Sequence, residues 1–192
     1  GGGIGDSPVR PDGVAKVSGD FAYSSDLWME DMLWGVTLRS PHPRARIRRI
    51  DVGAALATAG VTAVLTHADV PGAKTYGLEI EDQPVLAIDE VRYVGEPVAI
   101  VAADHPETAR RAAAVIVVDY EPLDPVTDTH AAMSPESPLV HAAPTQTHYP
   151  GEGNVLRHVR IRRGNVAAAA DVVVTGEYEV GMQDQAFLGP ES

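Results

Sequence analysis

An unbroken apolar run at residues 98–103 (Val-Ala-Ile-Val-Ala-Ala) marks the stretch around which the core is expected to form. An apolar strand with no polar alternation is expected to be buried on both faces. Gly95, Glu96 and Pro97 directly precede it. Glycine can adopt a positive φ, and proline fixes its own φ and lacks an N–H. The pattern therefore predicts a bend or bulge that leads into a central strand.

Other apolar stretches predict the remaining strands. Residues 61–66 and 115–120 are the expected partners of the central strand, one on either side of it in the sequence. Residues 32–38 predict a strand that ends before two prolines, because proline cannot continue a hydrogen-bonded ladder. Shorter strands are predicted at residues 21–23 and 84–88.

Two helices are predicted between these strands. Residues 106–114 are rich in Ala and Arg and have proline in the first turn, both typical of a helix. Residues 53–59 predict a shorter helix, with Asp51 as the candidate N-cap and Gly60 as its end. The order strand, helix, strand occurs twice and indicates two related units. The predicted fold class is α/β (α+β), not an all-β sandwich.

The two ends of the chain differ in composition from this region. Residues 1–12 are rich in glycine, proline and aspartate and are predicted to form an extended arm. Residues 126–153 contain many prolines and predict a long irregular connector. Residues 154–192 are interpreted as the start of a second domain, with strands predicted at residues 156–163 and 171–181. The chain begins without methionine and ends without a polar tail, so we expect a piece of a longer protein.

Composition narrows the functional classes. The chain of 192 residues has no cysteine, which excludes disulfides, iron–sulfur ligation and a cysteine nucleophile within it. Its 27 acidic and 15 basic residues give a formal charge of −12, which argues against binding to nucleic acid or an anionic membrane. No apolar run approaches the roughly 20 residues of a membrane span, and no signal peptide is expected. A cytoplasmic location is expected.

Local motifs predict no catalytic constellation. The seven histidines never show His-x-x-x-His spacing, and neither Gly-x-Gly-x-x-Gly nor Gly-x-Ser-x-Gly occurs. Arg44, Arg46 and Arg48 alternate and share one face of a predicted strand. A solvated edge strand explains them best, and an anion site is the alternative. The spacing of residues along the sequence thus predicts an α/β domain but no specific function.

Four stretches in a fixed order carry a family resemblance. They are residues 10–23 (RPDGVAKVSGDFAY), 38–47 (LRSPHPRARI), 91–99 (VRYVGEPVA) and 119–123 (DYEPL). Together they resemble the N-terminal part of the molybdopterin-binding (large) subunit of xanthine dehydrogenase and its relatives, the aldehyde oxidases and carbon monoxide dehydrogenases. The resemblance implies an α/β hammerhead domain at residues 13–125, followed by the first elements of a molybdenum-cofactor-binding domain.

The segment at residues 181–191 (GMQDQAFLGPE) is similar to the first strand of that cofactor-binding domain. The resemblance implies that Gln183 lies beside the molybdenum and hydrogen-bonds to its ligand shell, with Phe187 as a further cofactor-binding candidate. Gln185 stands where the family usually has histidine, and Gly189 where it usually has glutamate. An amide cannot titrate like an imidazole, and glycine removes a carboxylate.

The resemblance also implies an activity, namely hydroxylation of a purine such as hypoxanthine or xanthine with oxygen from water. Molybdenum-molybdopterin would be held by the full-length subunit, and electrons would leave through iron–sulfur clusters to FAD on partner domains or subunits. No catalytic residue or metal ligand is expected in this chain, so alone it should bind no molybdenum and show no turnover. Alternatives are an aldehyde-oxidising relative, a non-catalytic hammerhead scaffold, or a carrier domain modified at Lys16 or Lys74.

Overall fold

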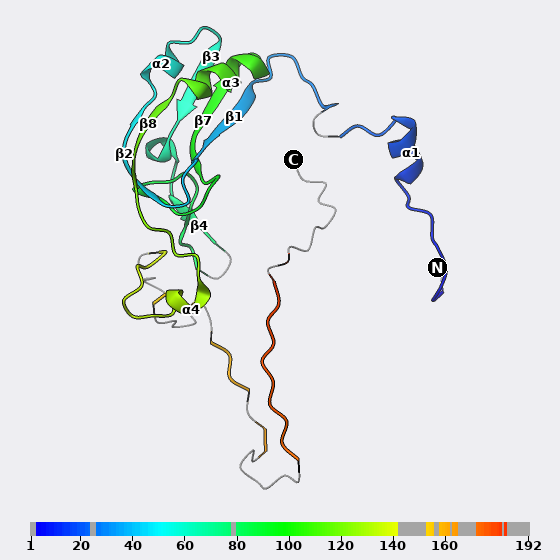
Figure 1. Ribbon diagram of the computed structural model, residues 1–192. Coiled ribbons are helices and arrows are strands. Elements are labelled where there is room, and N and C mark those ends of the chain that lie inside the picture. Colours follow the sequence, from blue (N-terminus) through cyan, green and yellow to red (C-terminus); the bar gives the residue numbers. More distant parts are fainter. Residues whose placement is uncertain are drawn as a thin grey trace. The chain divides into compact units, whose positions relative to one another are not determined.

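The computed structural model describes most of the chain in two units. The described residues are 3–23, 26–77, 80–141, 153–155, 158–161, 163–164, 172–181 and 183. One unit combines Gly1–Glu30 with Arg163–Ser192, and the other is Asp31–Arg162. All strands assigned in the described residues belong to the second unit (Figure 1).

Strand β7 (Pro97–Ala103) is the middle strand of an antiparallel sheet. It lies between β1 (Trp34–Arg39) and β3 (Val61–Leu65), and Val101 is in register with Val36 on one side and Val64 on the other (Figure 1). The predicted central strand and its partner at residues 61–66 are confirmed. The predicted bulge is also present, because the register shifts between Leu38 and Arg39, where β1 reaches Pro97.

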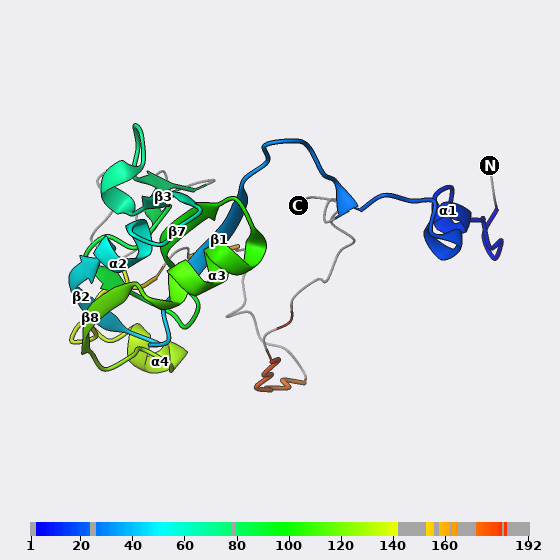
Figure 2. The ribbon, with the colours of Figure 1, turned by 90° about the horizontal axis from the view of Figure 1, so that it is seen from above.

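Helix α3 (Pro106–Ala114) covers one face of this sheet (Figure 2). The helix has the bounds predicted for it, with proline in the first turn and His105 accepting a 3.1 Å hydrogen bond from the Glu107 N–H. Its buried alanines are Ala109, Ala112 and Ala113, and they pack with Ala99, Val101 and Ala103 of β7. Alanine at each contact lets the helix backbone approach the sheet closely.

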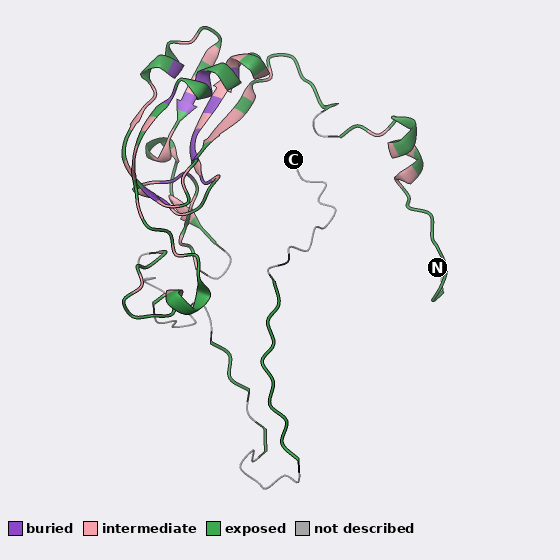
Figure 3. Cartoon of the chain, viewed as in Figure 1, coloured by how far each residue is buried: buried purple, intermediate pink, exposed green. Residues whose placement is uncertain are grey.

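The other face of β7 is covered only in part. Ile100 and Ala102 are half-buried, whereas Val98 on the same face is fully buried in a second cluster with Ala45 and Val91. Figure 3 shows how buried and half-buried positions are distributed over this unit. The prediction that both faces are buried is therefore wrong for most of the strand. An unbroken apolar run does not distinguish a helix-covered face from a half-open one.

The second cluster belongs to a second antiparallel sheet. Its strand order is β6 (Glu90–Val91), β2 (Ala45–Asp51), β8 (Val117–Pro122). The prediction that residues 115–120 pair with the central strand is wrong, because β8 pairs with β2. Only one face of β8 is apolar and partly buried, through Val118 and Tyr120, so the strand suits a sheet that is covered on one side.

The two predicted strand-helix-strand units are present in an unexpected form. One is β2, α2 (Gly53–Leu56) and β3, and the other is β7, α3 and β8. In each unit the helix leads from one sheet to the other, so its two strands never share a sheet. Helix α2 is shorter than the predicted 53–59, and its N-cap is Val52 rather than Asp51, although the Asp51 carboxylate accepts a 3.0 Å hydrogen bond from the Gly53 N–H.

Several shorter elements complete the described residues. They are α1 (Gly13–Ser18), the 3-10 helix η2 (His67–Asp69), the hairpin of β4 (Thr75–Tyr76) and β5 (Gln83–Pro84), and α4 (Thr129–Ala132). Helix α4 lies within the stretch that was predicted to be irregular. None of the helices in these ranges has the length and hydrophobicity needed to cross a bilayer.

Some predicted strands are not formed. Residues 21–23 contain no strand, and of residues 84–88 only Pro84 belongs to one. Residues 158–161, 163 and 172–181 also show no strand where they are described. The predicted domain boundaries, at 12/13, 125/126 and 153/154, stay predictions.

Candidate functional site

Of the two residues predicted to contact a cofactor, Gln183 is described and Phe187 lies outside the described residues. Gln183 is exposed and belongs to no helix or strand. Its amide offers two N–H donors and a carbonyl acceptor, which suits hydrogen bonding to an oxygen ligand. Residues 172–181 are likewise all exposed, so this described stretch does not form a cradle for molybdopterin by itself. In the described ranges, no three His, Asp or Glu side chains come together as a metal site.

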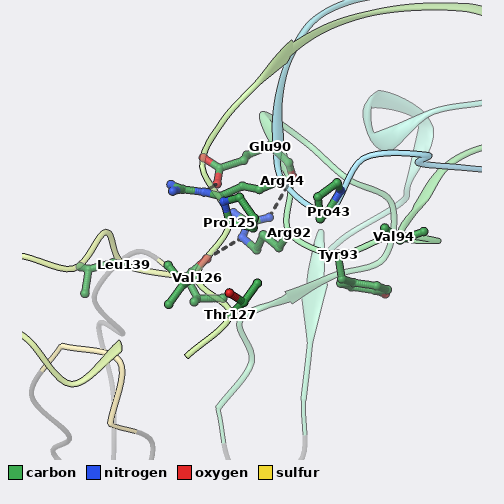
Figure 4. Close-up of a pocket in the computed structure, with 11 residues that line it drawn as sticks. Pro43, Arg44, Glu90, Arg92, Tyr93, Val94, Pro125, Val126, Thr127 and Leu139 are labelled. Carbon is green, nitrogen blue, oxygen red and sulfur yellow. Dashed lines mark hydrogen bonds and ion pairs between the residues drawn. The ribbon is translucent and has the colours of Figure 1, made fainter. Parts of the chain in front are cut away.

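A pocket in the unit Asp31–Arg162 has a more defined geometry (Figure 4). Its volume is about 230 Å³. It lies where the start of β2, strand β6 and the turn after β6 meet residues 125–140. The lining residues are Pro43, Arg44, Glu90, Arg92, Tyr93, Val94, Pro125, Val126, Thr127, Leu139 and Val140.

Arg44 forms one wall of this pocket. Its Nε lies 2.7 Å from Oε1 of Glu90, and its Nη1 donates a 3.0 Å hydrogen bond to the Asp124 carbonyl. The side chains of Arg44 and Glu90 are only 16% and 22% exposed, so water screens this ion pair less than a pair on the open surface. The backbone supports the pair because Ala45 and Arg46 are in register with Val91 and Glu90.

Arg92 lies in the middle of the lining residues (Figure 4). Its Nε donates to the Val140 carbonyl at 2.7 Å, and its Nη1 donates to the Glu90 carbonyl at 3.0 Å. Glu96 lies nearby, with Oε1 3.8 Å from Nη1 of Arg92. Most of the hydrogen bonds of this guanidinium therefore go to neutral carbonyl groups rather than to a carboxylate.

Glu96 is a buried acidic residue at 3% exposure. Its Oε2 accepts a short hydrogen bond from the Arg92 backbone N–H, and its own carbonyl accepts a 2.9 Å bond from the Ser40 N–H. Gly95, at φ +92°, donates its N–H to the Ser40 carbonyl at 2.8 Å. The Glu96 carboxylate thus closes the turn between β6 and β7 from inside, and Gly95 provides the backbone conformation that the turn requires.

Two tyrosines near Glu96 have shifted acidities. Burial raises the pKa of Tyr120, the nearby Glu96 carboxylate raises it further, and a hydrogen bond with Ser40 opposes the shift. Burial also raises the pKa of Tyr93, again with a contribution from Glu96. The His42 ring packs edge to face on Tyr120, with 4.9 Å between ring centroids. Both phenols therefore stay protonated at neutral pH.

Side-chain hydrogen bonds hold the described residues 128–140 and Asn154 together. Asn154 accepts a 2.8 Å bond from the Val140 N–H and donates to the carbonyls of Pro138 at 3.0 Å and Ala132 at 3.1 Å. Asp128 caps helix α4 by accepting a 2.7 Å bond from the Ala131 N–H. No strand is assigned among the described residues of this stretch, so these side chains fix one wall of the pocket.

Sequence reasoning missed Glu96, Arg92 and Asn154. The only signal for Glu96 was its position between Gly95 and Pro97, which indicated a bend but not a buried charge. The predicted arginine face is exposed at Arg46 and Arg48, which both pair with Glu121, but the edge-strand prediction is wrong because β2 lies between β6 and β8. Arg44 differs from them, since it points into the partly buried pocket instead of facing solvent.

Two small antiparallel sheets linked by β2-α2-β3 and β7-α3-β8 define the class as a mixed α/β hammerhead domain. The family model described as "Aldehyde oxidase and xanthine dehydrogenase, a/b hammerhead domain" matches residues 18–124, more than half of the chain. The chain therefore belongs to the aldehyde oxidase and xanthine dehydrogenase family, the molybdenum hydroxylases.

Known relatives agree with this assignment. The chain is 38% identical to a probable xanthine dehydrogenase subunit from Bacillus subtilis, over 96% of its own length and 24% of that protein. It is 32% identical to the nicotinate dehydrogenase large molybdopterin subunit of Eubacterium barkeri, over 98% of its length and 43% of that protein. The solved CO dehydrogenase from Oligotropha carboxidovorans is similar at a TM-score of 0.64 and 36% identity, covering 70% of this chain and 17% of that one. The chain thus spans less than half of each relative.

Proposed function

We propose that the chain is the N-terminal part of the molybdopterin-binding subunit of a xanthine dehydrogenase, which hydroxylates hypoxanthine or xanthine with oxygen from water. The observation that carries this proposal is the 38% identity to the Bacillus subtilis protein across 96% of the chain, together with the hammerhead match. The proposed partners are the remainder of the same subunit and subunits that carry iron–sulfur clusters and FAD. The proposed location is the cytoplasm, and the proposed process is purine catabolism.

In this proposal the hammerhead domain is a scaffold, and the molybdenum cofactor held by the full-length subunit would supply the redox chemistry. Within this chain, Gln183 is assigned to orient that cofactor through its amide, with Phe187 beside it. The exposed Gln183 amide has two N–H donors and a carbonyl acceptor that a partner can reach, which supports this assignment. No proton transfer is assigned to a residue of this chain.

A heterocycle other than a purine is the second candidate substrate. The relative from Eubacterium barkeri is named for nicotinate and matches 98% of the chain at 32% identity. The structures named for CO and for aldehydes match at 36% and 31% identity, so the hammerhead domain accompanies several chemistries. An aldehyde substrate and a non-catalytic scaffold are therefore alternatives that a direct assay must separate.

The test is an assay of the full-length subunit co-expressed with its iron–sulfur and flavin partners. The substrates are hypoxanthine, xanthine, nicotinate and an aromatic aldehyde, and both acceptor reduction and molybdenum content are measured. Purine-dependent reduction by a molybdenum-containing assembly is the expected result. Turnover of nicotinate or aldehyde alone would reassign the substrate, and a metal-free inert assembly would leave the scaffold as the function.

A further inference from the structure

We propose that the pocket between the turn after β6 and residues 125–140 binds a small organic carboxylate with a single apolar ring. This is a ligand site in the hammerhead unit itself, and it depends neither on the molybdenum cofactor nor on the substrate. All of its lining residues belong to the unit Asp31–Arg162. Four features of the pocket lead to this ligand class.

The first feature is the set of N–H donors that the two arginines still have available. Arg44 uses Nε and Nη1, and Arg92 uses Nε and Nη1. No hydrogen bond joins Nη2 of either arginine to another group in the part of the chain that the structure describes. A carboxylate is the acceptor that pairs best with guanidinium N–H groups, since the bonds are charge-assisted and can be bidentate.

The second feature is the balance of charge. The pocket is lined by two guanidinium groups and one carboxylate, Glu90, which is already paired with Arg44. Glu96 lies near Arg92, but the Nη1 to Oε1 distance is 3.8 Å and its other oxygen is bound to a backbone N–H. The lining itself thus has two positive groups and one negative group in a chain whose formal charge is −12, which favours an anionic ligand.

The third feature is the apolar part of the lining. Pro43, Val94, Pro125, Val126 and Leu139 surround the two arginines with aliphatic side chains (Figure 4). A ligand that carried only a charge, such as acetate, would leave this surface uncovered. An apolar ring would cover this surface, and burial of apolar surface contributes roughly 25 cal/mol of binding free energy for each Å² removed from water.

The fourth feature is size. The pocket holds about 230 Å³, which is below the roughly 300–1,000 Å³ of sites for drug-sized ligands. One ring with a carboxylate suits this volume, and a nucleotide does not. Tyr93, Val94 and Leu139 at the mouth are 46%, 63% and 44% exposed, so the site is open to a ligand from solution.

The test is titration of the 192-residue chain with benzoate, followed by NMR shifts of the Val94, Val126, Thr127 and Leu139 signals. We expect saturable binding with a Kd of about 1 mM or lower. Benzamide has the same shape without the charge, and acetate has the charge without the ring. Each should bind at least about tenfold more weakly. Failure of benzoate to saturate, or equal binding of benzamide, would overturn the proposal.

Two pairs of variants make the result specific to this pocket. Thr127→Trp fills the pocket from an exposed position and removes no side-chain hydrogen bond to any described residue, so it should abolish binding, whereas Thr129→Trp on α4 should not change it. Arg92→Gln should weaken binding about tenfold. Arg110→Gln, on the exposed surface of α3, is its control. Undiminished benzoate binding by a folded Thr127→Trp protein would contradict the proposed site even if Arg92→Gln is poorly folded.

Discussion

Arg92 Nε donates a 2.7 Å hydrogen bond to the carbonyl of Val140, a residue 48 positions further along the chain. The N–H of Val140 is bound in turn by Asn154 at 2.8 Å. Both backbone groups of Val140 are therefore satisfied by side chains, in a region where no strand pairs with it. The segment after the hammerhead strands is held to the turn between β6 and β7 through polar side chains rather than through a sheet.

Replacement of Glu96 should destabilise the hammerhead unit. Glu96→Ala leaves the Arg92 N–H without its acceptor and removes the carboxylate nearest to the Arg92 guanidinium. We expect a loss of about 2–4 kcal/mol in the free energy of unfolding, measured by urea denaturation. Glu96→Gln keeps one acceptor oxygen and should lose less. Glu107→Ala on the exposed side of α3 is the control, and a loss as large there would show that the effect is not specific to the buried carboxylate.

Alkaline pH should lower stability through Tyr120. Burial raises the pKa of Tyr120 in the folded state above the unfolded value near 10, so folding favours the protonated phenol. This contribution is fully present below pH 10 and is lost as the pH rises through the folded-state pKa. Urea denaturation between about pH 8 and pH 11.5 should show a steeper decline for the native chain than for Tyr120→Phe. Parallel curves for the two proteins would contradict this assignment, since Tyr93 titrates in both.

A side chain at Gly60 should be costly. Gly60 has φ +89°, and a Cβ there would lie 2.5 Å from Oδ1 of Asp104. Gly60→Ala should therefore lower the free energy of unfolding by about 1–3 kcal/mol, because the left-handed backbone and the close contact both disfavour alanine. Gly35→Ala in β1 is the matched control, since a Cβ at Gly35 would meet no atom within 4 Å. Thermal unfolding of the two variants should differ clearly, and equal melting temperatures would contradict the strain argument.

Gln183 should matter for activity but not for stability. In the full-length enzyme, Gln183→Ala should lower kcat at least about tenfold, because an amide that orients the cofactor is lost. The same change in the 192-residue chain should leave its unfolding unchanged, since the side chain is exposed. Glu179→Ala, an exposed neighbour, is the control. Unchanged kcat in a fully molybdenum-loaded Gln183→Ala enzyme would remove Gln183 from the proposed site.

Local signals explain which elements were predictable from the sequence. Helix α3 was predicted at its observed bounds because Pro106 pre-sets the first turn and the alanines that follow favour helix. The bend before β7 was predicted because Gly95 can adopt a positive φ, whereas Pro97 fixes its own φ and lacks an N–H. Both cases depend on residues within a few positions of one another, which sequence shows directly.

Long-range relations were not predictable in the same way. Residues 115–120 were predicted to form a strand, but the pairing of β8 with β2 depends on the path taken after α3, which no local pattern contains. The pocket depends on pairs far apart in sequence, such as Arg44 with Glu90, 46 positions later. The sequence indicates only a polar turn residue at Glu96. The burial of its carboxylate could not be predicted, because it requires hydrogen bonds that only the folded chain supplies. The role of Gln183 came from the family resemblance and remains a prediction.

The strand order β1-β7-β3 also affects how the chain is made. β1 and β3 leave the ribosome before β7, yet they share no ladder with each other. Neither strand can pair in this sheet until β7 has been synthesised. Until about Ala103 has emerged, Val36, Leu38 and Val64 lie on strands with open edges, the kind of surface that associates with other chains. Chaperone contact during translation should therefore concentrate on residues 34–65 and fall once β7 closes the sheet.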